Sequence, residues 1–298
     1  MMDKKTYINE ADMQRTVQQL TSTPLRDGDT EFCDLCVGSS LPSRQTIKEI
    51  VTLCRELLFP GFGGEAAVNS YNLEYTIGLQ CEQLKNLLEH EIVSALSITA
   101  RETPMSAHEV TAATVTARFI SRLPALRDIL LTDVNAIYLG DPAATSHEEV
   151  IFCYPSIKAI INYRVAHALQ QADVPIIPRM ISEMAHSETG IDIHPGATIG
   201  HHFAIDHGTG VVIGATAIIG DYVKIYQGVT LGALSFPLDA DGHPIKGVPR
   251  HPIIGNNVII YSNSTILGRI TIGDDAVIGG NIWVTEDVPA GAKVVQRR

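Results

Sequence analysis

Residues 193–231 read IHPGATIGHHFAIDHGTGVVIGATAIIGDYVKIYQGVTL, and aliphatic residues recur along this stretch at every sixth position. A period of six matches neither the 3.6-residue repeat of an α-helix nor the two-residue alternation of an isolated β-strand. It is the period of a β-solenoid with triangular coils, in which each side holds one short strand and one tight corner. The sequence therefore predicts a solenoid whose aliphatic residues point inward and whose small residues turn the corners.

Two rows of aliphatic residues carry this period. The first row comprises Ile193, Ile199, Ile205, Val211, Ala217, Val223 and Val229, and the second comprises Ile213, Ile219, Ile225, Leu231 and, after an interruption, Ile254, Ile260, Ile266, Ile272, Ile278 and Val284. The same period of six resumes after the interruption, which makes a chance run in a β-sandwich a poor explanation. We expect three-sided coils of about 18 residues that bury these rows on one another.

The part of the chain before the solenoid reads as helical. Helical patterns occupy 7–20, 43–59 and 69–98, with Ser43 placed as an N-cap. Another helix is expected after a capping box formed by Ser106 and Glu109, with a break at Pro124, and a further helix after Pro155. We predict an α-helical domain over 1–187, for oligomerisation and as a cap of the solenoid, and a β-solenoid domain over 188–298 with a long loop at 235–251.

Charge and composition narrow the classes of partner. The 298 residues carry a net charge of −11, of which the stretch from Gly190 onward contributes only −2. Nucleic acid is therefore not an expected partner, and a polyanionic ligand meets less repulsion at the solenoid. The sequence has no run of about 18 apolar residues and no apolar leader, so a cytoplasmic protein without a membrane partner is expected.

The five cysteines all precede the solenoid. Cys33 and Cys36 have the spacing of a redox or zinc motif, but no second pair follows, which favours two free thiols in a loop. We expect no metal site, and the odd number of cysteines suits a reducing compartment.

Two features indicate chemistry. Asp192 and His207 lie 15 residues apart, close to one coil, so that a carboxylate could orient and support a histidine acting as general base. The repeat is also interrupted by SFPLDADGHPIKGVPRH at residues 235–251, a loop that ends on Arg250 and His251. These two side chains form a cationic pair suited to a carboxylate ligand. The bland alternatives are a surface histidine at a corner and a solvated loop.

Four motifs make the sequence resemble serine O-acetyltransferases, the acetyl-CoA-dependent enzymes that commit serine to cysteine synthesis. They are DIHP at 192–195, IDHGTGVVIG at 205–214, YQGVTLG at 226–232 and RHP at 250–252, and the similarity extends over roughly 133–288, including DPA at 141–143. The resemblance implies a helical N-terminal domain followed by a left-handed parallel β-helix. It also implies a homotrimer or a dimer of trimers, with active sites between neighbouring subunits.

The resemblance assigns roles residue by residue. His207 is implied as the general base and Asp192 as its partner. Asp141 and Asp206 would bind the serine ammonium, and Arg250 with His251 its carboxylate. Gly232, Ala233 and Ser262 fall at positions that contact coenzyme A in the family. The serine hydroxyl would attack the thioester directly, with acetyl-CoA as co-substrate, no permanently bound cofactor, and cysteine as a feedback inhibitor.

Three departures from the family pattern stand out. The loop before Arg250 is long, and Ala215 occupies a position where many relatives have glutamate. The chain ends on Arg297 and Arg298 rather than on the extended, isoleucine-terminated tail that docks into cysteine synthase. Because burying an arginine in an isoleucine pocket carries a heavy desolvation penalty, we expect no tail-mediated complex with that enzyme.

The residues also leave alternatives open. An acetyltransferase for sugars or antibiotics would share the fold without needing Asp141, Asp206, Arg250 and His251 for an amino acid. A zinc-dependent carbonic anhydrase would use the imidazoles of His201, His202 and His207, whose spacing is too local for three ligands gathered from adjacent coils and subunits. A non-catalytic scaffold is the third alternative.

Overall fold

The computed structural model describes residues 9–22, 26–27, 30–31, 41–63, 68–100 and 102–296. Its contacts divide the chain into two compact units, Met1–Leu41 and Pro42–Arg298. In the first unit the described elements are helix α1 (Glu10–Ser22) and the antiparallel pair β1 (Arg26–Asp27) and β2 (Thr30–Glu31). The predictions about Cys33, Cys36 and Arg298 concern residues outside the described ranges. Among the described cysteines, Cys54, Cys81 and Cys153 are free thiols.

Six helices are described in the second unit before its strands begin. They are α2 (Arg44–Leu58), α3 (Leu73–Thr99), α4 (Met105–Gly140), α5 (His147–Cys153), α6 (Pro155–Gln170) and α7 (Ile177–Thr189). The Ser43 cap is confirmed, since its hydroxyl accepts a hydrogen bond from the Thr46 N–H. The predicted capping box at Ser106 is wrong. Helix α4 begins at Met105, so Ser106 lies inside it, and the N-cap residue Pro104 makes no side-chain cap.

The expected break at Pro124 is also wrong. Helix α4 runs through Pro124 without interruption over 36 residues. Proline in a helix interior costs roughly 3 kcal/mol. Here Leu123, Leu126 and Leu130 are buried on the same helix, on both sides of the exposed Pro124. The packing of this apolar stripe outweighs the local penalty.

The helix after Pro155 is confirmed as α6, whereas α5 and α7 carry no pattern that we had interpreted as helical. Helix α7 ends where Gly190 adopts a left-handed conformation with φ of 70° and donates its N–H to the His186 carbonyl. Glycine takes this conformation without the penalty that a Cβ imposes. The chain therefore leaves the last helix and enters the first strand within two residues.

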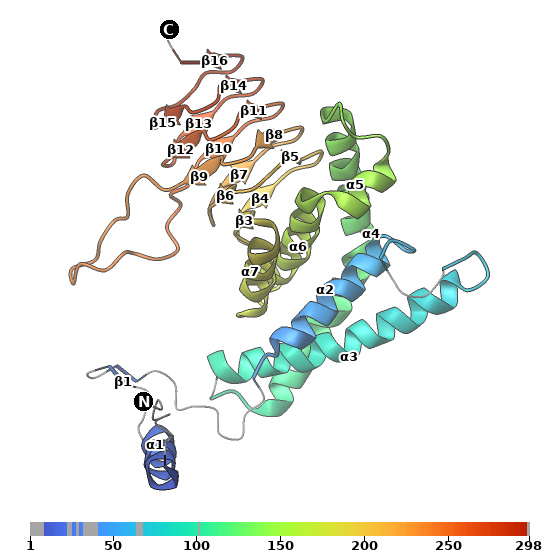
Figure 1. Ribbon diagram of the computed structural model, residues 1–298, viewed down its shortest axis with the longest axis vertical. Coiled ribbons are helices and arrows are strands. Elements are labelled where there is room, and N and C mark those ends of the chain that lie inside the picture. Colours follow the sequence, from blue (N-terminus) through green and yellow to red (C-terminus); the bar gives the residue numbers. More distant parts are fainter. Residues whose placement is uncertain are drawn as a thin grey trace, which may run out of the picture. The chain divides into compact units, whose positions relative to one another are not determined.

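The remaining strands form a parallel β-solenoid with three faces (Figure 1). The first face holds β3 (Asp192–Ile193), β6 (Val212–Ile213), β9 (Thr230–Gly232), β12 (Thr265–Leu267) and β15 (Trp283–Val284). The second face holds β4 (Thr198–Ile199), β7 (Ile218–Ile219), β10 (Ile253–Ile254) and β13 (Thr271–Ile272). The third face holds β5 (Ala204–Asp206), β8 (Lys224–Tyr226), β11 (Ile259–Ile260), β14 (Val277–Ile278) and β16 (Lys293–Val294). This confirms the predicted solenoid.

Every member of the two predicted aliphatic rows is buried. The register explains why there are two rows. Ile193 pairs with Ile213, 20 residues on, whereas Ile213 pairs with Leu231, 18 residues on. The first coil is thus two residues longer than expected. Counting by six across this excess moves the first row from strand positions, such as Ile205, to the position before a strand, such as Val211.

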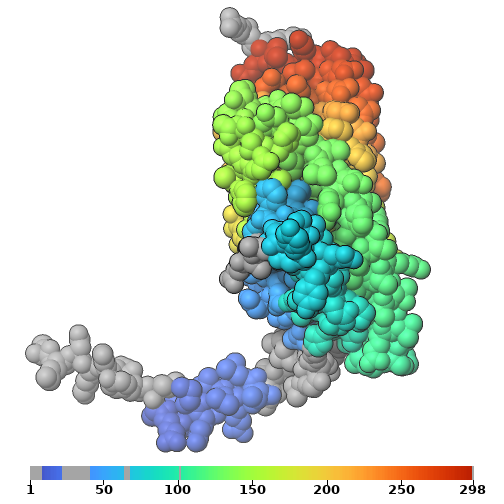
Figure 2. Space-filling view, turned by 90° about the vertical axis from the view of Figure 1, so that its right-hand side faces the viewer, coloured from blue at the N-terminus to red at the C-terminus, as the bar shows by residue number. Residues whose placement is uncertain are grey.

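Helices cover the open end of the first coil, next to β3 (Figure 1). The first coil has no neighbour on that side, so its carbonyl groups need other partners. Side chains of α6 supply them: the Tyr163 hydroxyl donates to the Ala197 carbonyl, and Arg164 donates to the carbonyls of Ile199 and Gly200. In Figure 2 the last coils, in red, form the end of the second unit farthest from α2 and α3.

A buried ion pair joins the helices to this coil. Arg164 of α6 binds both carboxylate oxygens of Asp133 of α4, at 3.0–3.1 Å. Asp133 also accepts the backbone N–H of Phe203, just before β5. Burial raises the pKa of Asp133 to about 6, against the opposing effects of Arg164 and the Phe203 N–H. Helix α4, which ends two turns later at Gly140, is therefore fixed relative to β5.

No described helix is long and apolar enough to cross a membrane.

Candidate active site

His207 lies at the corner between the third and first faces, here called the His207 corner (residues 207–210), and Asp206 comes directly before it. Asp206 ends β5, and the chain then turns through His207, Gly208 and Gly210, all with positive φ. The His207 side chain is 75% exposed, and its Nε2 lies 3.9 Å from Oδ1 of Asp206. Positive φ also occurs at other corner residues, such as Asn263 and Asn281, so it is a property of the coil and does not single out His207.

Asp141 reaches this corner from the end of α4, where it is the C-cap residue. Its Oδ2 accepts a hydrogen bond of 2.6 Å from the Tyr154 hydroxyl, and its Oδ1 accepts the Ala143 N–H. The Tyr154 hydrogen bond, followed by the Ala143 N–H, lowers the pKa of Asp141. The same contact raises the pKa of Tyr154 to about 12. Asp141 is therefore an ionised carboxylate fixed from both sides.

Asp141 and Asp206 line one small pocket together with Tyr154 and Lys224. The predicted ammonium-binding pair thus comes together from two distant segments of the chain. Sequence reasoning missed Lys224 and Tyr154. Lys224 could have been found by counting one ideal coil of 18 residues from Asp206; in the actual register it pairs with Ala204, diagonally next to Asp206.

Asp192 lies on β3 of the first face and pairs with Val212, five residues after His207. In the described structure no hydrogen bond or ion pair joins Asp192 to His207, whose ion-pair partner is Asp206. The Asp192–His207 pairing stays a prediction.

Arg250 and His251 lie at a different corner, between the first and second faces, here called the His251 corner. Both Nδ1 contacts of His251 are with Thr216, whose backbone N–H lies at 3.0 Å and whose hydroxyl lies at 2.8 Å. Because Nδ1 accepts the backbone N–H, the proton of the neutral ring resides on Nε2. The close packing requires Gly214, where a Cβ would lie 2.0 Å from Cδ2 of His251.

His251 is not the cation that the sequence suggested. Burial, reinforced by Arg250 and Arg269, lowers its pKa to about 4. Arg250 therefore supplies the charge, and His251 supplies a neutral Nε2–H donor. The guanidinium of Arg250 lies 5.6 Å from the ring centre of Phe236, and its Nε is buried without a hydrogen-bond partner in the described structure.

The two corners do not meet within one chain. One side of a coil separates them, and six residues, of which only two or three form a strand on this face, span at most about 20 Å. The described contacts of Arg250 and His251 involve Phe236, Thr216, Val248 and Arg269, none of which belongs to the His207 corner. A single chain therefore presents two half-sites, one rich in carboxylates and one with donors for a carboxylate.

Comparison with known proteins gives this arrangement a family. The family model described as "Bacterial transferase hexapeptide (six repeats)" matches residues 251–281. The chain is 48% identical over 264 residues to the protein named "Serine acetyltransferase, plasmid" of Synechococcus elongatus, across 86% of this chain and 82% of that protein. The chain belongs to the serine acetyltransferase family. This confirms the resemblance inferred from the four motifs.

Solved structures of the family agree. Serine acetyltransferase isoform 3 of Entamoeba histolytica, determined in complex with cysteine, is 31% identical with a TM-score of 0.71, covering 96% of this chain and 91% of that one. Serine acetyltransferase 1 of the same organism, also in complex with L-cysteine, is 34% identical with a TM-score of 0.73, covering 87% and 88%. The helical part and the solenoid are thus both shared with enzymes of the serine acetyltransferase family.

The residues expected to contact coenzyme A flank the first face of this family member. Gly232 ends β9 and packs so closely that a Cβ would lie 2.8 Å from Cδ2 of Leu267. Ala233 follows where the long loop departs. Ser262 lies at the stack of corners above His207, and its carbonyl accepts the Asn281 N–H. Their role in coenzyme binding stays a prediction.

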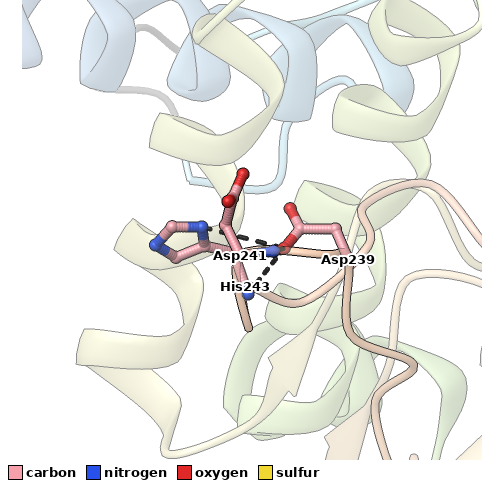
Figure 3. Close-up of side chains that lie close together, drawn as sticks. All are labelled: Asp239, Asp241 and His243. Carbon is pink, nitrogen blue, oxygen red and sulfur yellow. Dashed lines mark hydrogen bonds and ion pairs between the residues drawn. The ribbon is translucent and has the colours of Figure 1, made fainter.

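The long loop of this serine acetyltransferase brings Asp239, Asp241 and His243 close together (Figure 3). Oδ1 of Asp239 accepts the backbone N–H groups of Asp241 and His243, at 3.0 and 2.8 Å. All three residues are exposed. These bonds form a local turn of the loop. Among the described residues of this single chain, His201, His202 and His207 do not form a cluster of possible metal ligands.

Proposed function

We propose that this protein transfers the acetyl group of acetyl-CoA to the hydroxyl of L-serine, forming O-acetylserine and CoA as the first step of cysteine synthesis. The observation that carries the proposal is the meeting of Asp141 and Asp206, from different elements, beside His207. Two carboxylates suit the serine ammonium, and an adjacent imidazole suits its hydroxyl.

His207 would accept the proton of the serine hydroxyl as its oxygen attacks the thioester carbonyl. The tetrahedral intermediate then collapses, the carbon–sulfur bond breaks, and the leaving thiolate takes the proton back from the imidazolium. Asp192 would orient the ring of His207. The reaction needs no acyl-enzyme and no permanently bound cofactor.

The carboxylate of serine would be bound by Arg250 and His251 of a neighbouring copy. The position of the two corners at opposite edges of the first face supports this, because the contacts of one corner include no residue of the other. A head-to-tail contact that joins the His207 corner of one copy to the His251 corner of the next closes into a ring. We propose a homotrimer, alone or as a dimer of trimers, with coenzyme A bound near Gly232, Ala233 and Ser262.

Cysteine has the ammonium and carboxylate of serine, so it would compete for the same groups. The relatives solved with cysteine support this proposal. The cytoplasmic location and the absence of tail-mediated binding to cysteine synthase stay predictions.

The test is release of free thiol from acetyl-CoA with serine as acceptor, compared with amino sugars and with His207→Ala. We expect turnover with serine only, and a loss of roughly 10²–10⁴-fold in kcat for His207→Ala, the usual contribution of a general base. Circular dichroism would check that the variant is folded. Turnover with amino sugars but not serine, or near-normal turnover by His207→Ala, would contradict the proposal.

A further inference from the structure

Among the described residues that line the pocket of Asp141 and Asp206, Lys224 is the one with a positively charged side chain. It belongs to β8, and its side chain is only 18% exposed. Its Nζ donates a 2.6 Å hydrogen bond to the Gly140 carbonyl and lies 3.1 Å from Oδ2 of Asp206. Lys224 thus connects the end of α4 to the end of β5.

The position of Lys224 has a clear physical basis. The last carbonyls of a helix lack partners within the helix and carry the negative end of its dipole, which favours a cation. Helix α4 ends at Gly140, and a Cβ at Gly140 would lie 3.5–3.7 Å from the end of the Lys224 side chain. The ammonium of Lys224 therefore binds the helix end and a carboxylate at the same time.

Lys224 also reduces the net negative charge of the candidate site. Two carboxylates facing one substrate ammonium leave an excess negative charge, and Lys224 offsets it. The two oxygens of Asp206 are divided: Oδ2 faces Lys224, and Oδ1 lies 3.9 Å from Nε2 of His207. A carboxylate close to an imidazole favours the protonated ring, which cannot act as a base.

We propose that Lys224 is a positioning residue for acetyl transfer, which holds Asp206 against the end of α4 and offsets the charge of this carboxylate beside His207. This inference rests on the proposed function in one respect, that His207 is the base. The charge relation between Lys224 and His207 can be measured without it.

The charged groups around His207 determine the sign of the effect. Asp206 of β5 lies next to His207, and Asp141 at the end of α4 interacts with it electrostatically. Tyr154 and Glu149 in turn contact or interact with Asp141. Asp192 of β3 lies on the coil beneath. Apart from Tyr154 these groups are carboxylates, so removing Lys224 leaves a more negative surrounding. The pKa of His207 should then rise, and the acidic limb of the activity profile should move to higher pH.

The experiment is the pH dependence of carbethoxylation of His207 by diethyl pyrocarbonate, which attacks the neutral imidazole. Mass spectrometry of the peptide that contains His207 gives the rate for this residue alone, with the exposed His243 of the same chain as an internal reference. The variants are Lys224→Gln, which keeps a donor for the Gly140 carbonyl but loses the charge, Lys224→Met, which loses both, and Lys224→Arg, which keeps the charge. Lys293→Gln removes an equal charge from β16, at the far end of the solenoid.

We expect the midpoint for His207 to rise by about half a pH unit or more in Lys224→Gln and Lys224→Met, given partial screening by solvent. Lys224→Arg, Lys293→Gln and the reference His243 should be unshifted. The acidic limb of kcat/KM for serine should move in parallel. If Lys224→Met does not fold, Lys224→Gln alone is decisive, because it removes the charge and keeps a hydrogen-bond donor in the side chain.

An unchanged or lower midpoint in folded Lys224→Gln would overturn the inference. So would an equal shift in Lys293→Gln, since the effect would then reflect net charge only. These outcomes differ from failure of the proposed function, which appears as normal turnover by His207→Ala whatever the midpoint of His207.

Discussion

Single residues at the two corners have distinct tasks, and their partners fix their protonation states. Asp141 stays ionised because Tyr154 and Ala143 donate hydrogen bonds to it. His251 stays neutral because it is buried beside Arg250 and Arg269. The ligand groups that these residues suit are an ammonium at the His207 corner and a carboxylate at the His251 corner, as an amino acid requires.

Arg250 provides a test of shared recognition by substrate and inhibitor. Arg250→Ala should raise the KM for serine by roughly 10–100-fold, because it removes a charge-assisted hydrogen bond. The inhibition constant for cysteine should rise by a similar factor, since both ligands carry the same carboxylate. Steady-state kinetics with both ligands checks this, with Lys246→Gln, on the exposed part of the same loop, as control. A change in only one of the two constants would indicate a separate site for cysteine.

The sequence identified the main ligand candidates but not the residues that support them. Asp206, His207, Arg250 and His251 lie in recognisable motifs, whereas Tyr154 reaches Asp141 from 13 residues further along the chain, after a second helix. That contact depends on how α4, α5 and α6 pack. The neutral state of His251 depends on burial at a corner, which spacing alone does not reveal.

Among the elements, α4 and α6 do most to position the site. The Asp133–Arg164 ion pair lies two helical turns from Asp141 and also binds the backbone before β5. Asp133 is fully buried and Arg164 is 6% exposed. Loss of one member strands the other without its charge partner, which is strongly destabilising.

Arg164→Met should therefore lower the free energy of unfolding by about 3–5 kcal/mol. Urea denaturation at a fixed protein concentration measures this value. Lys158→Met is the matched control. Lys158 lies on α6, as Arg164 does, and its ion pair with Glu188 of α7 is more than one-third exposed on both side chains. That control should cost less than about 1 kcal/mol. Equal effects of the two substitutions would contradict a special role for the buried pair.

The stability of the protein should depend on pH through two histidines at the corner between the first and second faces, where the His251 corner lies. The folded-state pKa values of His194 and His251 are both lowered to about 4, by burial first and then by neighbouring cations. The unfolded chain then binds protons more readily than the folded one. Their contribution to stability is complete above the ordinary histidine pKa of about 6.5 and is lost as pH falls from there towards 4.

His194→Asn isolates part of this effect, because its Oδ1 replaces the Nδ1 that accepts the Gly196 N–H and does not titrate. Between pH 6.5 and pH 5 the parent protein should lose about 1 kcal/mol more stability than this variant. Urea denaturation at several pH values would show the difference. Parallel stability curves would mean that His194 titrates normally in the folded state.

Among the elements, the six-residue repeat of aliphatic residues predicted the solenoid and its buried rows, because every coil repeats one packing arrangement. It did not predict the two-residue excess at His207–Gly210 or the continuity of α4 through Pro124. The first is an insertion that the repeat itself cannot signal, and the second depends on packing against α3 and α6. Local patterns describe an element well only where its neighbours are copies of itself.

For the whole molecule, the separation of the two corners is the decisive feature. Asp206 and His207 lie at one corner of the solenoid, and Arg250 and His251 at another, so the proposed serine site would require two copies of the chain. Activity should therefore depend on assembly and be lost when the copies dissociate.

Mixing two inactive variants tests this claim most directly. His207→Ala and Arg250→Ala would each be purified, shown to have little activity with serine, and then co-expressed in equal amounts with different affinity tags. In a ring of head-to-tail contacts, about a quarter of the interfaces then join an intact His207 corner to an intact His251 corner. Selection for both tags excludes trimers of a single variant, so one interface in three is intact, and we predict that doubly tagged trimers recover about a third of the parent activity per site. Mixed assemblies no more active than the two variants alone would contradict a site shared between subunits.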